Sequence, residues 1–181
     1  MYIDLTLQIS KEIIKTNNLE NKQLLNHFAT HFDIMDKIFP LEYIKRDGII
    51  FNKIGQKLID LTSDELNKIK ENSFVLFNTG FINKVGYFSK EYSDNQPEIS
   101  TNLIFKLIEK KVSIIGLDFK GVKKGSDHRK YDQLCADNNL FIVENLTNLD
   151  KVSELKDFIV YTFPLNYTFL TGVPCRVVVE K

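Results

Sequence analysis

Residues 100–119 read STNLIFKLIEKKVSIIGLDF, and this stretch decides the fold class. Ser100 is a favourable N-cap for an amphipathic helix that runs to about Lys111. Its buried face is expected to carry Leu103, Ile104, Leu107 and Ile108. Residues 112–119 then form a short apolar run rich in β-branched residues, which predicts a strand. A helix followed at once by such a strand indicates an α/β domain.

Similar apolar runs extend this pattern along the chain. They predict strands at residues 1–6, 73–79, 139–146, 157–165 and 174–180. No repeat or Gly/Ser-rich linker interrupts them, so we expect one domain over residues 1–181. Strands that alternate with a few helices predict a mixed α/β fold with its central strands covered on both faces.

The segments between these runs carry weaker signals. Residues 9–28 have apolar positions at helical spacing, with a turn expected at Asn17-Asn18. An Asp47-Gly48 turn is expected to open strand-like alternation over residues 47–60. Thr62 or Ser63 should cap a helix over residues 64–71, and Glu65 would complete a capping box on Thr62.

Composition excludes several classes of protein. The chain has 181 residues, 24 basic and 24 acidic, and this balance argues against nucleic acid or an anionic membrane as a partner. No apolar run approaches the roughly 20 residues that span a bilayer. The opening MYIDLTLQISKEII is unlike a secretory signal, and the two cysteines suit reduced thiols. We therefore expect a cytoplasmic protein.

Histidine is scarce, yet two of the three histidines, His27 and His31, lie within seven residues together with Asp33. Imidazole and carboxylate groups are the ligands of zinc, manganese and iron. On a regular helix Asp33 would point about 200° away from His31, and a straight strand would separate His27 from Asp33 by roughly 20 Å. All three can reach one ion only if the chain bends between them. The alternative is two histidines at the polar edge of a buried helix.

A second group of polar residues comes later in the chain, with His128, Asp132 and Glu144 as its members. Glu144 follows the apolar run at residues 140–143, where a strand should be buried. Ionised carboxylates are almost never buried without a partner. Glu144 therefore either ends a strand at the surface or faces a cation.

These residues resemble the signature of the metal-dependent cyclase family, which includes bacterial kynurenine formamidase and isatin hydrolase. His27-x-x-Thr30-His31-x-Asp33 is similar to the family's His-x-Gly-Thr-His-x-Asp motif. Five further matches follow the family order over nearly the whole chain: Ile3-Asp4-Leu5-Thr6, Phe77-Asn78-Thr79-Gly80-Phe81, Ile115-Gly116-Leu117-Asp118, Val143 to Leu149, and Gly172 to Arg176.

The resemblance implies a swivelling β/β/α fold, assembly into homodimers or homotetramers, and a divalent metal, zinc or manganese, that activates water for hydrolysis of an amide or lactam-like bond. It places His27, His31, Asp33 and Glu144 at metal-ligand positions. A further family histidine, about twelve residues before the glutamate, falls at Asp132, with His128 four residues earlier; which of the two faces the metal stays open.

Two departures bear on the chemistry. The family glycine is Ala29, and the family's acid/base histidine is Lys37. Lysine near pKa 10 is a poor base at neutral pH unless burial or a cation lowers its pKa, although a fixed cation can hold an oxyanion or a carboxylate. His128 is the other catalytic candidate.

The substrate is expected to be a small molecule. Thr79 and Gly80 follow a strand and could present backbone amides to it. Phe28 and Phe32 bracket His31 and either line an apolar pocket or pack in the core. The predicted function is metal-dependent hydrolysis of a small amide, N-formyl or lactam-like bond. The alternative is a protein of the same fold that binds a small molecule without turnover.

Overall fold

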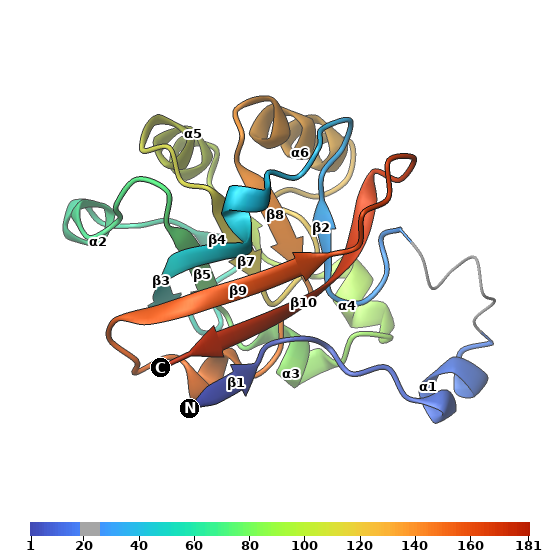
Figure 1. Cartoon of the computed structure of the whole chain (residues 1–181). Helices are drawn as coiled ribbons and strands as arrows, with labels where there is room; N and C mark the ends of the chain where they lie inside the picture. Colours follow the sequence, from blue (N-terminus) through green and yellow to red (C-terminus); the bar gives the residue numbers. More distant parts are fainter. Residues whose placement is uncertain (19–25) are drawn as a thin grey trace.

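The computed structural model describes residues 1–18 and 26–181 and is built around one mixed β-sheet (Figure 1). Its strands, in spatial order, are β1 (Tyr2–Asp4), β10 (Gly172–Glu180), β2 (His31–Asp33), β8 (Phe141–Glu144), β7 (Ile114–Leu117), β5 (Phe74–Asn78), β3 (Lys45–Asn52) and β9 (Phe158–Pro164). Strand β9 also pairs with β10, so the sheet closes on itself as a ring, and β1 pairs with the C-terminal part of β10. Two short strands, β4 (Leu58–Ile59) and β6 (Glu98–Ile99), form a separate pair.

The ring is parallel on one side and antiparallel on the other. Neighbours among β3, β5, β7 and β8 run parallel, whereas β2, β9 and β10 pair antiparallel with their neighbours. Mixed α/β architecture was predicted from the alternation of strands and helices and is confirmed.

Alternation along the strands builds two hydrophobic cores. In β5, Phe74 and Leu76 pack inside the ring, whereas Val75 and Phe77 pack on its outer face. Helices α2 (Ser63–Asn67), α5 (Thr101–Glu109) and α6 (Asp127–Asp137) contribute buried residues to the outer core. In the parallel strands β3, β5, β7 and β8 the period of two therefore fills both cores, whereas β2, β9 and β10 contribute to the inner core alone.

The remaining helices are short. They are α1 (Lys11–Thr16), α3 (Phe81–Val85), α4 (Lys90–Asp94) and the 3₁₀ turns η2 (Leu41–Ile44) and η3 (Leu149–Lys151). In Figure 1, α3 and α4 lie near one another, below α2 and α5 in this view, and Phe81 of α3 packs against the outer core. The chain ends lie together, because the Met1 ammonium donates to the Lys181 carbonyl at 2.6 Å (Figure 1).

Several local predictions are confirmed. Thr62 caps α2 and forms the capping box with Glu65, and Ser100 caps α5. Asn17 ends α1 as expected, although residues 19–25 of the predicted 9–28 segment lie outside the described residues. Helix α2 ends at Asn67, four residues earlier than predicted.

The predicted turn at Asp47-Gly48 is wrong. Both residues lie inside β3, paired with β5 and β9. A Cβ on Gly48 would lie 2.0 Å from the Phe158 ring, so glycine here makes room for a neighbouring aromatic side chain. No helix among the described residues is long and apolar enough to cross a membrane.

Candidate metal centre and adjoining cavity

Strand pairing places three polar side chains on the outer face of the ring. His31 in β2 pairs with Glu144 in β8, and Asp33 is two residues further along β2. Phe32 between them points into the inner core, so His31 and Asp33 point outward. All three polar residues are buried, with exposures of 1% each. Glu144 is therefore buried and does not end its strand at the surface.

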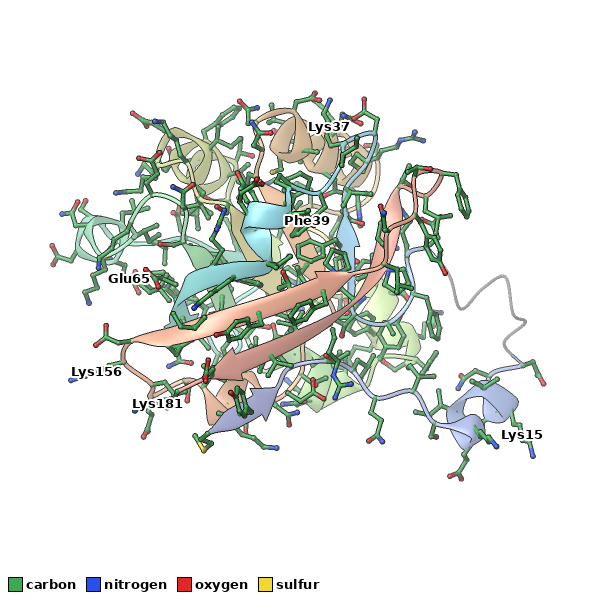
Figure 2. The ribbon with its side chains drawn as sticks, viewed as in Figure 1. Lys15, Lys37, Phe39, Glu65, Lys156 and Lys181 are labelled. Carbon is green, nitrogen blue, oxygen red and sulfur yellow. The ribbon has the colours of Figure 1, made fainter. Side chains whose placement is uncertain are left out.

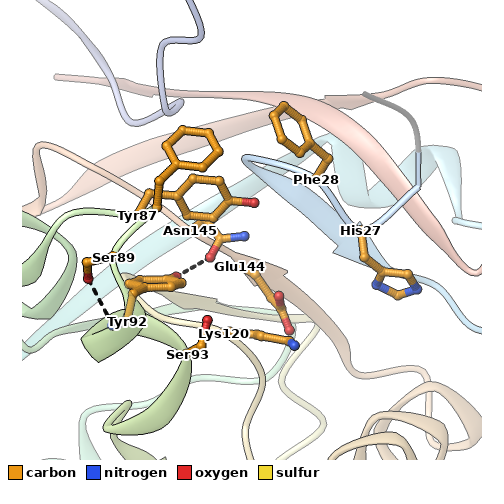
Figure 3. A pocket seen from close by; sticks show the side chains of 10 residues that line it. His27, Phe28, Tyr87, Ser89, Tyr92, Ser93, Lys120, Glu144 and Asn145 are labelled. Carbon is orange, nitrogen blue, oxygen red and sulfur yellow. Dashed lines mark hydrogen bonds between the residues drawn. The ribbon is translucent and has the colours of Figure 1, made fainter. Parts of the chain in front are cut away.

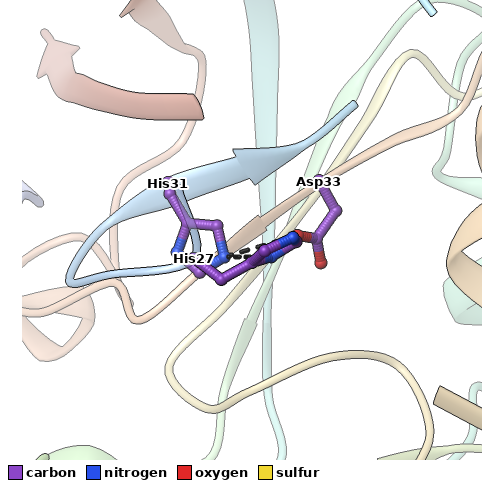
Figure 4. Close-up of side chains that lie close together, drawn as sticks. All are labelled: His27, His31 and Asp33. Carbon is purple, nitrogen blue, oxygen red and sulfur yellow. Dashed lines mark hydrogen bonds and ion pairs between the residues drawn. The ribbon is translucent and has the colours of Figure 1, made fainter. Parts of the chain in front are cut away.

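A bend before β2 brings His27 to the same place (Figure 4). Ala29 has a left-handed backbone with φ of 52°, which turns the chain between the two histidines. Nδ1 of His27 lies 2.7 Å from Oδ1 of Asp33 and 3.2 Å from Nε2 of His31. The sequence required such a bend for these side chains to meet.

Helix α6 supplies the other side of the cluster. Nε2 of His128 lies 3.0 Å from Oδ2 of Asp132, one helical turn away, and 3.5 Å from Oε1 of Glu144. Oε2 of Glu144 in turn lies 3.4 Å from Nε2 of His31. Asp33 belongs to both halves of the cluster. Its carboxylate forms one group with His27 and His31 and a second group with His128 and Asp132. In each group the donor atoms lie within 4.8 Å of one another. Both His128 and Asp132 face the cluster, which the sequence had left open.

The donor atoms fit a divalent cation. Oδ2 of Asp33 and Oδ1 of Asp132 are buried and accept no hydrogen bond from the described residues, whereas the buried Oδ1 of Asp33 and Oε1 of Glu144 face the ring nitrogens of His27 and His128. Nδ1 of His31 donates to the Ala29 carbonyl at 3.0 Å, so Nε2 faces the cluster and is the nitrogen that loses its proton when the ring binds a cation. Nε2 of His27 lies 2.9 Å from the Thr171 hydroxyl. This is the second layer of contacts that orients histidine ligands of metal ions.

Charge in the cluster is strongly coupled. Burial alone would lower the pKa of His31, but the carboxylates of Asp33 and Glu144 outweigh it and raise the pKa to about 9. Burial, followed by the charge of Asp33, raises the pKa of Glu144 to about 7, and burial raises that of Asp132 to about 6. The pKa of Asp33 is lowered because contact with the two histidines outweighs its burial. Three carboxylates packed this closely need compensating positive charge, which a bound cation would add.

A cavity of about 310 Å³ opens beside the cluster (Figure 3). Its lining combines aromatic rings with a few polar groups: His27, Phe28, Tyr87, Phe88, Ser89, Tyr92, Ser93, Lys120, Glu144 and Asn145. His27 and Glu144 belong to both cluster and cavity, so a molecule in the cavity meets the cluster directly. This is the usual composition of a small-molecule site.

The model of the family described as "Putative cyclase" matches residues 3–124 of this chain. The chain belongs to this family. The matched residues include His27, His31 and Asp33, which confirms the resemblance drawn from the sequence.

Solved structures share the cyclase-family fold. Isatin hydrolase A from Labrenzia aggregata, bound to benzyl benzoate, is 17% identical, with a TM-score of 0.71 over 99% of this chain and 93% of that one. A predicted metal-dependent hydrolase from Bacillus stearothermophilus is 17% identical, with a TM-score of 0.67 over 99% and 97% of the two chains. No curated protein sequence matches the chain. The swivelling fold expected from the resemblance is confirmed.

The structure separates Lys37 from the cluster. Its ammonium group lies 2.7 Å from Asp137 at the end of α6 and 3.1 Å from Asp36, on the outside of the molecule (Figure 2). These two carboxylates raise the pKa of Lys37 further above its usual value. Lys37 therefore pairs on the outside of the molecule and is not part of the cluster.

Three of the expected substrate-binding residues also lie elsewhere. Phe32 is fully buried in the inner core, which is the packing alternative. The Thr79 amide and hydroxyl both donate to Asp118, at 3.1 and 2.5 Å, so they are not free for a ligand. Gly80 is the N-cap of α3 and is absent from the cavity lining, whereas Phe28 lines the cavity.

Sequence reasoning missed much of the cavity wall. Tyr87, Phe88 and Tyr92 come from the segment that carries α3 and α4, for which no helix was predicted. A signal was present, since Ser89 caps α4 by accepting from the Tyr92 amide. This cap lies among the three aromatic residues, so it could have predicted the helix that carries Tyr92.

Proposed function

We propose that this member of the cyclase family is a metal-dependent hydrolase that cleaves a small amide, N-formyl or lactam-like C–N bond. One observation carries the proposal. Histidine and carboxylate donors from three segments converge beside an aromatic cavity, and two of their buried oxygens, Oδ2 of Asp33 and Oδ1 of Asp132, accept no hydrogen bond from the described residues.

In this proposal His27, His31 and Asp33 hold the ion, and Asp132 and Glu144 complete its surroundings. Nitrogen and oxygen donors of this kind suit zinc or manganese. A bound divalent ion would lower the pKa of a water molecule and polarise a carbonyl group.

The chain's own residues perform the other tasks. His128 is half-buried, with Nε2 between Asp132 and Glu144, where it can hold a proton and pass it to a leaving nitrogen. The rings of Phe28, Tyr87 and Tyr92 would bind an apolar substrate and exclude water around the reacting bond. Lys120 on the cavity wall can attract an anionic group of the substrate.

The neighbours support the class of substrate. One solved isatin hydrolase, 17% identical with a TM-score of 0.70, is bound to the product analogue thioisatinate. We carry over a small cyclic amide as the first class to test. The non-catalytic alternative rested on the loss of an acid/base histidine at position 37, and it is less favoured because His128, between Asp132 and Glu144, can take that role.

The resemblance to the cyclase family and the composition of the chain also bear on its assembly and its location in the cell. We propose a homodimer or homotetramer, to be checked by light scattering, and a cytoplasmic protein with reduced Cys135 and Cys175, both free and buried.

The proposal is tested by metal content and turnover together. Protein purified without chelators should hold zinc or manganese by plasma mass spectrometry and should hydrolyse members of a panel of N-formyl aromatic amines and lactams. Asp33→Ala and His31→Ala should lose both properties, whereas Asp127→Asn, an exposed aspartate in the first turn of α6, should keep them. Full metal occupancy in Asp33→Ala would refute the site.

A further inference from the structure

The peptide groups of Ala29 join the proposed metal site to the cavity wall. Ala29 adopts a φ of 52°, a left-handed backbone conformation that residues other than glycine rarely adopt. Its N–H donates to the Tyr87 hydroxyl at 2.9 Å. Its carbonyl accepts from Nδ1 of His31 at 3.0 Å and from the Asn145 amide at 2.6 Å. Protein groups therefore hold this residue on both sides.

Asn145 is itself fixed from the cavity side. Its side-chain oxygen accepts a hydrogen bond from the Tyr92 hydroxyl (Figure 3). Because Tyr92 holds that oxygen, the Asn145 side-chain nitrogen is turned toward Ala29, where it donates to the Ala29 carbonyl. The Asn145 carbonyl also accepts from the Thr30 hydroxyl at 2.9 Å, and its side chain is 2% exposed. The amide therefore cannot turn without breaking a buried hydrogen bond.

We propose that Tyr87, Tyr92 and Asn145 are positioning residues, which hold the strained Ala29 peptide so that its carbonyl aims Nε2 of His31 at the metal. This inference rests on the proposed function. The three residues are called the Ala29 clamp below. Tyr87 and Tyr92 touch the cavity, so the wall that would hold substrate also sets the orientation of a metal ligand.

The need for a clamp follows from alanine at position 29. A Cβ disfavours the left-handed region, so the free loop would relax toward negative φ and turn the carbonyl away from His31. The imidazole would then lose its fixed orientation. Loss of a contact of this second layer typically weakens metal affinity 10- to 100-fold.

Two variants remove one oxygen each and keep the aromatic ring. Tyr87→Phe removes the acceptor of the Ala29 N–H, and Tyr92→Phe removes the donor that orients Asn145. We expect each to weaken Zn²⁺ affinity at least tenfold, measured by competition with a chelating dye. Tyr167→Phe, on the β9–β10 loop away from the cavity lining, is the matched control and should bind Zn²⁺ like wild type.

A second readout does not depend on metal. In the metal-free protein the Ala29 amide should be protected from hydrogen exchange, and Tyr87→Phe should remove that protection.

A third test uses the backbone of residue 29 itself. Glycine tolerates positive φ, so in an Ala29→Gly background Tyr87→Phe should cost less Zn²⁺ affinity than it does alone. A general loss of structure would not be rescued by this single change.

The outcomes separate the two proposals. Wild-type Zn²⁺ affinity and a protected Ala29 amide in both tyrosine variants would overturn the clamp while leaving the proposed function in place. A wild-type protein that binds neither Zn²⁺ nor Mn²⁺, yet shows a protected Ala29 amide that Tyr87→Phe exposes, would overturn the proposed function and would limit the role of the clamp to holding the Ala29 peptide against the cavity wall.

Discussion

Two histidines of the proposed site, His27 and His128, each pack against a glycine. The Cβ atom of any other residue at these two glycine positions would collide with the imidazole ring. A Cβ on Gly172 in β10 would lie 2.7 Å from Nδ1 of His27, and a Cβ on Gly121 would lie 2.5 Å from the His128 ring. Gly172 pairs with Asp33 across the sheet, so its missing side chain leaves the space that His27 fills. At the residue scale, the site depends as much on these absent side chains as on the ligands.

Gly172→Ala tests this dependence. The methyl group should push the His27 imidazole away from Asp33 and weaken zinc affinity about tenfold, while the crowding costs about 1–3 kcal/mol of stability. Calorimetric zinc titration and urea unfolding measure the two effects. Gly48→Ala, which crowds Phe158 instead, is the matched control and should lose stability but keep zinc affinity. Equal zinc affinities in the two variants would contradict the prediction.

A residue far from the site carries a pH-dependent contribution. Glu65 lies 2.8 Å from the Lys53 ammonium and also accepts from the Thr62 amide. Burial would raise its pKa, but Lys53 and the Thr62 amide outweigh burial and lower it. The stability that Glu65 contributes is therefore present above its unfolded pKa, and it is lost as the pH falls through its lowered folded pKa.

Glu65→Gln keeps the size of the side chain and removes this charge. We expect a loss of about 1–2 kcal/mol at pH 7, because Lys53 is left buried without its partner, and a much smaller loss near pH 3. Urea unfolding at both pH values measures it. Glu71→Gln breaks the exposed pair with Lys111 and should cost well under 1 kcal/mol at either pH. A loss in Glu65→Gln that does not change with pH would argue against the ion pair.

At the scale of elements, helix α6 completes the site. Its first turns supply His128 and Asp132, and its end is tied to the segment after β2 by the Lys37–Asp137 pair and by the Gln133 amide, which donates to Asp36 at 2.7 Å. These contacts are partly exposed, so each contributes little by itself.

Lys37→Ala separates this docking role from the catalytic role that the sequence suggested. We expect a stability loss below about 1 kcal/mol and unchanged zinc affinity, since the ammonium group pairs away from the cluster. His128→Ala should instead abolish turnover of any substrate found. Thermal unfolding, zinc titration and kinetics measure the three effects. Loss of turnover in Lys37→Ala at full metal occupancy would restore the lysine to the mechanism.

The elements that the sequence predicted well are those whose own residues determine them. The strands at 73–79 and 139–146 are continuous apolar runs, and the Thr62 and Ser100 caps are local hydrogen bonds. The bend between His27 and His31 could be required on geometric grounds, because neither regular form brings the ligands together.

Other features depend on contacts that are distant in sequence. The partner of Lys37 is Asp137, a hundred residues away, so the sequence around Lys37 could not show that it points outward. Helices α3 and α4 have five residues each and are too short to form without packing against the rest of the chain. The cavity wall they carry was missed for that reason.

On the scale of the whole molecule, the proposed metal site joins parts that lie far apart in the sequence. Strand β2 comes from the first fifth of the chain, and β8 and α6 from the last third. Without a cation, three buried carboxylates and three histidines share this junction. A ligand that binds the folded state alone stabilises it, by about 2.7 kcal/mol when present at 100 times its Kd.

Metal removal should therefore lower the stability of the whole chain. We expect chelator treatment to reduce Tm by roughly 5–10 °C for a chain of this size, and added zinc or manganese to restore it. Differential scanning calorimetry at fixed pH measures the shift. Asp132→Asn should shrink the difference between loaded and metal-free protein, because it weakens binding, whereas Asp127→Asn on the same helix should leave it unchanged. Identical Tm values for chelated and metal-loaded wild type would contradict this prediction. They would mean that the cluster is stable without an ion, with protons on its carboxylates in place of the metal.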